Sequence, residues 1–462
     1  MLDAVKGVES IVDEMPIEAA LATTHDADGR PTQLLPLTHL IRISLYWLGI
    51  STVWSGVLDI VNGRLQFTHL VPKGGEGLGA FQIALVGTFI AIAVQPTIGT
   101  ISDYTITRWG RRKPYIFIGS LLDLVFLWGV ATSNSLFAVA AFVSLLQFSS
   151  NFAQGPFQGY VPDLVPGRQV GLASGLIGLF AALGNVVGYV VAAGAVWLSA
   201  TDSNAFLYGT MGIGLVEFLT MLSVVIHVDE GSRVKPRNGR SWFSIACEAW
   251  NGEVLHERSF LWLVGSRFFI LTGAALYPAM STFYLAQVFG MDAAQTGRTK
   301  LLLLAVVGLC VTIAVIPSSR LSDRIGRKPV IYASCAIGAL GLAMGAAAPV
   351  LAVAFVGAAM FAVAAGAFLA VDWALMSDIV PKASTGRYIG ISNVATASAG
   401  TVALALGGAA VMDTVNHWLG YGAGPRAALI FGVGCYVLGA VLLKPVVEKR
   451  REDADALVLA AS

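Results

Sequence analysis

Charged residues are scarce in this sequence. Only 12% of its 462 residues are Asp, Glu, Lys or Arg, whereas 56% are hydrophobic, and the mean hydropathy is +0.73. In soluble domains roughly a quarter of the residues are charged, so this composition excludes a soluble fold. The net charge is only +1, and the basic segments are short and lie between apolar runs, which argues against nucleic acid as a partner.

Patterns for metal, nucleotide and nucleophilic chemistry are also missing. The four cysteines have neither paired nor metal-ligand spacing, so we interpret them as packing residues: Cys247, Cys310, Cys335 and Cys435. The sequence contains no Gly-x-x-x-x-Gly-Lys-Ser/Thr loop and no visible nucleophile–base pair. These absences argue against ATP-driven transport and against an enzyme, and they predict no metal and no cofactor.

Long apolar runs are abundant. A run of roughly twenty residues crosses about 30 Å of hydrocarbon as a helix. Twelve such runs begin near Leu37, Gly79, Tyr115, Leu136, Val170, Ala205, Ser259, Thr299, Val330, Val350, Ile389 and Pro425. The sequence therefore predicts an all-α membrane protein of about twelve helices in two sets of six.

The polar segments divide the chain into predicted units. They are a cytoplasmic N-terminal tail (1–33), a six-helix bundle (34–228), a cytoplasmic linker (229–258), a second six-helix bundle (259–446) and a cytoplasmic C-terminal tail (447–462). The linker mixes aromatic and acidic residues from 242 to 256, as a helix on the membrane surface does. The acidic N-terminal tail lacks the basic-then-apolar order of a cleaved signal peptide.

Basic residues predict the orientation in the membrane. If the spans alternate, most Lys and Arg residues fall on one side and few on the other. Under the positive-inside rule the crowded side is cytoplasmic. We therefore expect a multi-pass protein of the inner (plasma) membrane, surrounded by lipid, with both termini in the cytoplasm.

A charged turn occurs twice. The first copy comprises Asp103, Gly110, Arg111, Arg112, Lys113 and Pro114, and the second comprises Asp323, Gly326, Arg327, Lys328 and Pro329. Asp323 follows Asp103 by 220 residues, and a later pair, Asp163 and Asp378, is separated by 215 residues. Nearly equal offsets indicate that the two halves are parallel repeats.

Two six-helix repeats with this turn between the second and third spans resemble the major facilitator superfamily over the whole chain. The resemblance implies alternating access, in which the two bundles rock about a solute site near the bilayer midplane. The charged groups of the turns are then gate candidates: Asp103, Arg111, Arg112, Asp163, Asp323, Arg327 and Asp378. The Asp carboxylates can accept from backbone donors at a neighbouring helix start, and the guanidinium groups can pair with Asp163 and Asp378. Alternatively, these cations only fix topology.

Residues 95–195 carry a finer resemblance. The Asp-to-Gly spacing of the first turn is four residues longer than that of the second. The fourth and fifth spans contain motif residues: Asn151, Gln154, Gly155, Pro156, Asp163, Leu164, Gly184, Asn185, Gly188 and Tyr189. This pattern is similar to that of the sucrose and other glycoside carriers of the glycoside-pentoside-hexuronide type, and it implies a proton-coupled sugar carrier. Gln147 and Gln158 depart from the pattern, since those carriers have a proton-binding Asp and an Arg there. Replacing both charges avoids an unpaired charge in the membrane but removes that proton site.

Four amides in the fourth span lie on one helical stripe: Gln147, Asn151, Gln154 and Gln158. Their spacings of four, three and four residues place them on one face. Amides are unfavourable against lipid, so we expect this face to line the bundle interior or a watery cavity, where amides suit the hydroxyls of a sugar. The alternative is that they only bond neighbouring helices. Other predicted solute contacts are Asn185, Tyr189, Trp54 and Trp373.

Acidic residues within the spans are candidates for proton coupling, because intramembrane acids are usually functional. Asp123, Glu217 and Asp372 are the candidates, whereas Asp59 and Arg267 are expected near helix ends, within reach of water. The sequence thus predicts a monomeric secondary transporter of a small neutral polar solute, a glucoside or disaccharide, with protons. Alternatives are facilitated diffusion, efflux, or a membrane assembly factor that does not transport.

Overall fold

The computed structural model describes residues 33–446, apart from residues 69, 106, 167–168, 231–238, 240, 243, 245–257, 380–391, 393–394 and 397. Within these residues every regular element is a helix, and twelve helical segments are long and apolar enough to cross a membrane. The predicted all-α class and the count of about twelve spans are confirmed. The predicted tails and most of the predicted linker helix lie outside the described residues.

The N-terminal half provides the first six spans. Their helices are α3 (Leu37–Ser44) with α4 (Tyr46–Phe67), α5 (Glu76–Ser102), α6 (Lys113–Thr132), α7 (Leu136–Gln158), α9 (Val170–Leu198) and α10 (Ala205–His227). A short helix, α8 (Tyr160–Leu164), follows α7.

The C-terminal half provides the other six. Its helices are α12 (Arg258–Val288), α13 (Ala293–Ile325), α14 (Arg327–Ala347), α15 (Leu351–Ile379), the π-helix η4 (Ala403–Asp413) with α17 (Thr414–Leu419), and α18 (Ala423–Leu443).

Local sequence explains several helix ends. The Ser135 side chain caps α7 by accepting from the Ala138 backbone N–H, and Asp292 with Gln295 forms a capping box at the start of α13. Between α13 and α14 the chain reverses at Gly326, whose φ of 96° is a conformation that suits glycine. The corresponding turn in the first half uses Gly110, with φ 115°. The repeated glycine of the charged turn therefore serves the same backbone role in both halves.

The two halves pack their helices in the same pattern. In the N-terminal half α5 packs on α7, α6 on α7 and α10, and α4 on α10; in the C-terminal half α13 packs on α15, α14 on α15 and α18, and α12 on α18. Small residues allow close approach, since a Cβ on Gly341 of α14 would lie 2.7 Å from the Gly357 carbonyl oxygen of α15. This correspondence confirms two parallel six-helix repeats.

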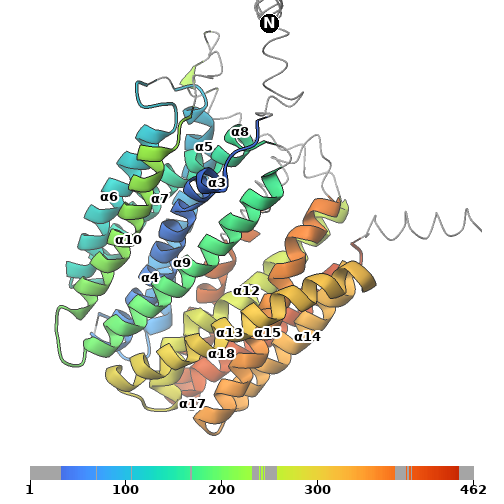
Figure 1. The fold of residues 1–462 in the computed structure, drawn as a ribbon. Helices are drawn as coiled ribbons and strands as arrows, with labels where there is room; N and C mark the ends of the chain where they lie inside the picture. Colours follow the sequence, from blue (N-terminus) through green and yellow to red (C-terminus); the bar gives the residue numbers. More distant parts are fainter. Residues whose placement is uncertain are drawn as a thin grey trace, which may run out of the picture.

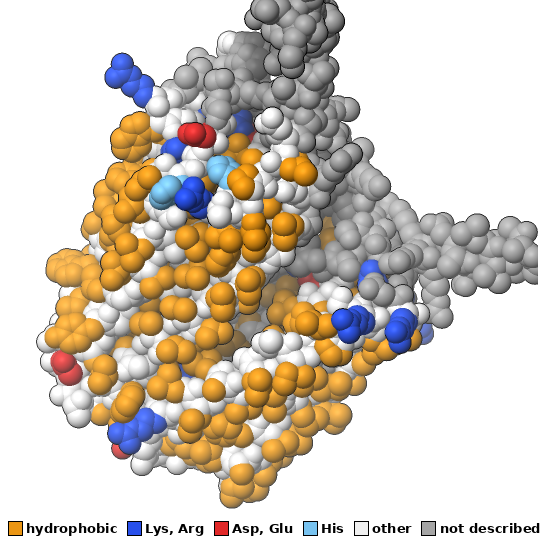
Figure 2. Space-filling model, in the orientation of Figure 1, with side chains coloured by type: hydrophobic (Ala, Val, Ile, Leu, Met, Phe, Trp, Pro, Cys, Tyr) orange, Lys and Arg blue, Asp and Glu red, His pale blue; other side chains and the backbone are white. Residues whose placement is uncertain are grey.

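The two halves meet toward one end of the molecule (Figure 1). We call the end with the Asp103 and Gly326 turns the turn face, and the other end the opposite face. The helix pairs α5–η4, α9–α13 and α4–α12 pack across the boundary. Contacts such as Gly77 with Gly408 and Trp197 with Gly297 involve helix ends at the opposite face. Figure 2 shows the surface hollowed between the two halves.

Candidate solute site and gates

The amide stripe lies on α7, on the side away from its most exposed apolar residues. Leu145 and Phe148 are exposed hydrophobic side chains of this helix, as expected for residues that face lipid. Gln154 follows Leu145 by nine residues, or two and a half turns, and therefore lies on the other side of α7. Gln147, Gln154 and Gln158 are each half-buried.

The four amides differ in their partners. Asn151 is buried and donates to the Gln147 backbone carbonyl (2.7 Å) and to its Oε1 atom (3.2 Å). Gln147 also packs against Gly87 of α5, where a Cβ would lie 2.6 Å from its Cγ atom. Within the described chain Gln154 and Gln158 have no hydrogen-bond partner, so their donors and acceptors are available.

The other predicted solute contacts lie on neighbouring helices. Asn185 on α9 is exposed, beside Gly184 and Gly188, which pack tightly on α4. Tyr189 is half-buried on α9, one turn further along. Trp54 on α4 packs against the buried core of the N-terminal half. The Trp373 side chain lies outside the described residues.

Polar bonds join the halves near the opposite face. The Asp413 carboxylate at the end of η4 accepts from the backbone N–H groups of Gly77 (3.1 Å) and Leu78 (2.7 Å). Because Gly77 and Leu78 belong to the first turn of α5, this acid of one half caps a helix of the other. The Tyr421 hydroxyl donates to Glu76 at 2.9 Å, and burial raises the pKa of Tyr421 to about 12, so it remains a donor.

A second layer of cross-half bonds lies deeper in the boundary between the two halves, which we call the seam. Gln287 of α12 donates to the Gln66 side chain at 3.0 Å and accepts from Asn416 at 2.9 Å. Further along α4, Asn62 donates to the Ala279 carbonyl at 3.1 Å. These amides close the seam with neutral bonds, each of which contributes about 0.5–1.5 kcal/mol.

One turn further along α4 from Asn62, the seam contains a buried ion pair. Asp59 of α4 is 1% exposed and Lys300 of α13 is 2% exposed; the Lys300 ammonium pairs with Asp59 Oδ1 and also donates to the Thr282 hydroxyl at 2.6 Å. Among ion pairs between described residues, it is the one that joins the two halves. The expectation that Asp59 lies near a helix end within reach of water is wrong, since packing of the halves buries it.

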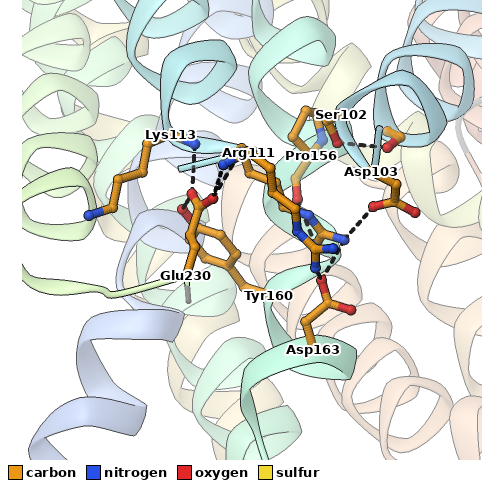
Figure 3. A network of polar contacts seen from close by, with 10 residues as sticks. Ser102, Asp103, Arg111, Lys113, Pro156, Tyr160, Asp163 and Glu230 are labelled. Carbon is orange, nitrogen blue, oxygen red and sulfur yellow. Dashed lines mark hydrogen bonds and ion pairs between the residues drawn. The ribbon is translucent and has the colours of Figure 1, made fainter. Parts of the chain in front are cut away.

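The first charged turn forms a polar cluster within the N-terminal half (Figure 3). Arg112 pairs with Asp103 (2.7 Å) and with Asp163 (2.6 Å), and it also donates to the Pro156 carbonyl at 3.2 Å. Arg111 pairs with Asp163. These contacts tie the end of α5, the start of α6 and the α7–α8 junction together.

Glu230, directly after α10, completes this cluster. Its carboxylate accepts from the backbone N–H groups of Arg111 (2.6 Å), Arg112 (2.8 Å) and Lys113 (2.7 Å) and from the Tyr160 hydroxyl (2.6 Å). An acid was expected to accept from a helix start here, and Glu230 fills that role, while Asp103 pairs with Arg112. Burial and then the Arg112 charge lower the pKa of Arg111, and burial and then the Glu230 charge raise the pKa of Tyr160.

The second charged turn is described only in part. Arg327 is buried and donates to the Ser322 hydroxyl at 2.7 Å. The side chains of Asp323 and Asp378 lie outside the described residues.

Asp123 and Glu217 form a sealed acidic pair in the core of the N-terminal half. Both are 0% exposed and they interact electrostatically, while Asp123 Oδ2 and Glu217 Oε2 have no hydrogen-bond partner among the described residues. Ser149 donates to Asp123, and the Tyr46 hydroxyl donates to Glu217 at 3.2 Å. Two negative charges so close together in a buried setting would repel strongly.

Asp372 is paired within the C-terminal half. It accepts from Arg267 Nε at 2.8 Å, and Arg267 also donates to Ser392. Arg267 is 5% exposed, so the expectation that water reaches it is wrong as well.

Sequence reasoning missed Lys300, Glu230 and Asp413. Lys300 stands at the expected start of the eighth span, where a lysine ordinarily reaches water, but α13 begins seven residues earlier and carries Lys300 inside. Glu230 lies in the predicted linker. The spacing of Asp413 gave no signal, because its partners belong to the other half.

The fold and the repeated turns define a membrane carrier of the major facilitator class. The family described as MFS/sugar transport protein matches residues 77–442, which is most of the chain, and the chain belongs to this family. The predicted membership in the major facilitator superfamily is thereby confirmed.

Curated relatives resemble one part of the chain. The sucrose transport protein SUC4 of Arabidopsis thaliana is 29% identical over 168 residues, 32% of each chain. The sucrose transport protein SUT1 of Oryza sativa subsp. japonica is 30% identical over 177 residues, 34% of this chain and 32% of the relative. The match thus spans about a third of the length of these relatives.

Solved structures share the fold at low identity. A bacterial homologue of the human lysosomal transporter Spinster has a TM-score of 0.67 at 14% identity, covering 88% of this chain and 96% of that one. A D-xylose-proton symporter has a TM-score of 0.63 at 16% identity, covering 89% and 98%. These similarities extend over nearly all described helices.

Proposed function

We propose that this chain is a secondary transporter that moves a small neutral polar solute, a glucoside or disaccharide, by alternating access together with protons. The observation that carries the proposal is the state of Gln154 and Gln158. They are half-buried amides without a hydrogen-bond partner in the described chain, on the side of α7 away from lipid. Asn151 and Gln147 extend this surface, and Asn185, Tyr189, Trp54 and Trp373 are its further proposed contacts.

The cross-half bonds support the mechanism. They hold the molecule together toward the opposite face, while the surface is hollowed between the halves (Figure 2). In this proposal the protein is a monomer of the plasma membrane with its termini and the turn face in the cytoplasm, and the structure corresponds to a state open to that side. The matched relatives are sucrose transport proteins, which supports the choice of a sugar.

The turn cluster is the proposed cytoplasmic gate. Its ion pairs between Arg111 or Arg112 and the acids Asp103 and Asp163 lie within the N-terminal half in this state. Closing this face would bring Asp103 to the C-terminal half, where Asp323, Arg327 and Asp378 supply the matching charges. Arg112 is buried, so it would have to exchange one partner for another without being left unpaired, since an unpaired buried charge is costly.

Counterflow in proteoliposomes tests the solute site. We expect entry of labelled sucrose or a simple glucoside against unlabelled solute, and we expect Gln154→Ala to weaken binding by about threefold to tenfold, the effect of losing one hydrogen bond. Leu145→Ala, on the lipid side of the same helix, is the matched control and should exchange normally. Equal exchange by both variants would place the solute elsewhere, and no exchange of any sugar would overturn the proposal.

Facilitated diffusion is the second candidate, and Gln147 favours it because an amide cannot bind a coupling proton. Accumulation of solute with and without a pH gradient separates the two. Accumulation that requires the gradient supports symport, and Asp123→Asn, Glu217→Gln and Asp372→Asn test the three acids predicted from sequence. Equilibration that ignores the gradient would establish facilitated diffusion.

A further inference from the structure

Asp59 and Lys300 form a buried ion pair between the two halves. The pair sits deeper in the seam than the neutral bonds of Asn62 and Gln66, on helices that belong to different bundles. Any motion that opens the opposite face must separate α4 from α12 and α13, so it must break this pair. A buried ion pair is costly to break when it leaves one charge without a partner.

One oxygen of Asp59 is unused. Lys300 and the Thr282 hydroxyl both approach Oδ1, at 3.3 Å for Thr282, whereas the buried Oδ2 atom has no hydrogen-bond partner among the described residues. A carboxylate in this setting can become neutral by binding one proton at Oδ2. Neutralising it removes the attraction for Lys300, and with it the main charge contact across the seam.

Among the described residues, few titratable groups other than Lys300 surround Asp59. Lys300 faces it from α13, the Tyr189 hydroxyl lies within electrostatic reach on α9, and α12 offers the neutral Thr282. Helix α10 packs on this stretch of α4 through Ile213 and Phe206, against Gly56 and Gly63. Helix α5 contacts α4 near its end, where Gly79 meets Leu65.

We propose that Asp59 takes up the coupled proton and that the Asp59–Lys300 ion pair is the lock that this proton opens. The inference rests on the proposed transport function and adds to it the residue that couples the proton. One proton from the opposite side forms an O–H bond with the Asp59 carboxylate, which breaks the contact with Lys300 and lets the opposite face open. When the pair re-forms, that bond breaks, the proton leaves toward the turn face, and Asp59 is again an anion beside Lys300.

The position of Tyr189 links this lock to the solute. Tyr189 is a proposed solute contact, and it lies within electrostatic reach of Asp59. A solute bound against Tyr189 would therefore lie within electrostatic reach of the proton site. In this way one proton and one solute can favour the same change of state.

A distance measurement without solute tests the lock. Spin labels at Asn204→Cys and His417→Cys, in the full chain with its own cysteines replaced by alanine, report the separation of the halves at the opposite face by pulsed electron resonance. We expect the wild-type pair to show a short distance at neutral pH and a growing long-distance population as the pH falls. Asp59→Asn, which mimics the protonated acid, should raise the ratio of open to closed molecules by about tenfold at every pH and abolish the pH response.

Two further variants keep the test decisive. Asp292→Asn removes an exposed acid at the start of α13 that caps its own helix within one half, and asparagine caps a helix equally well, so it should leave both the distance and its pH response unchanged. Asp59→Asn combined with Lys300→Gln restores a neutral hydrogen-bonded pair, so it should fold, stay closed and ignore pH. A full pH response in Asp59→Asn, or in this double variant, would overturn the inference.

Transport assays separate failure of the lock from failure of the proposed function. If Asp59→Asn exchanges solute but no longer accumulates it on a pH gradient, both hold. If the label distances behave as expected while no sugar exchanges, the lock stands and the proposed solute is wrong. If Asp59→Asn accumulates solute like the wild type, Asp59 is not the coupling residue.

Discussion

Asp413 of the C-terminal half caps α5 of the N-terminal half. Its carboxylate accepts from the backbone N–H groups of Gly77 at 3.1 Å and of Leu78 at 2.7 Å. A helix cap is ordinarily supplied by a residue of the same segment. Here the cap exists only while the two halves are in contact, so it stabilises one state of the molecule and is absent from any state in which this face opens.

Replacing Asp413 by alanine should open the opposite face. Two charge-assisted hydrogen bonds are lost, each contributing about 1.5–3 kcal/mol, so the population of closed molecules should fall by about tenfold or more. The label pair at Asn204→Cys and His417→Cys measures this directly. Thr414→Ala, at the exposed next position, should leave the distance unchanged, and an unchanged distance in the Asp413 variant would show that this cap does not hold the face closed.

Glu230→Ala should destabilise the N-terminal half. Its carboxylate satisfies three backbone donors at the start of α6 and the Tyr160 hydroxyl, and we expect a loss of about 1–3 kcal/mol. A lower midpoint of thermal unfolding in detergent would show this. The exposed neighbour Asp229 is the matched control, because Asp229→Ala removes the same charge without those bonds. Equal midpoints for the two variants would contradict the prediction.

Gly155→Ala should separate α5 from α7. A Cβ at Gly155 would lie 2.3 Å from the Gln95 backbone carbonyl oxygen, a contact that backbone must move to relieve. Gly175→Ala is the control, since nothing lies within 4 Å of a Cβ there and alanine favours a helix by about 1 kcal/mol. We expect lower stability and lower solute exchange for Gly155→Ala alone. The prediction fails if both alanines are tolerated.

Glu217→Gln should be tolerated far better than Glu217→Ala. The amide can accept from Tyr46 and donate to Asp123, as the protonated partner of a carboxyl pair does. Alanine leaves buried polar groups without partners, at a cost of about 1–3 kcal/mol each. Expression yield and the midpoint of thermal unfolding would distinguish the two. Similar damage by both substitutions would mean that the pair is held as two charges rather than by a shared proton.

The architecture could be predicted from the sequence, because hydrophobic length sets the number of spans and the repeated turn sets the symmetry. The Arg112–Asp163 contact could also be predicted from the sequence, since both residues belong to motifs at the same end of their helices. The contacts of Lys300 and Asp413 could not be predicted. Their partners lie more than two hundred residues away in the other half, and these contacts depend on how the two bundles are tilted against each other. Asp59 was misplaced for the same reason.

The bonds of Glu230 also determine where the polypeptide can be divided. A fragment that ends before this residue loses the acid that caps its own third span, whereas one that ends at Gly239 retains it. Two separately encoded halves joined in the membrane should therefore reassemble only when the break falls after Glu230.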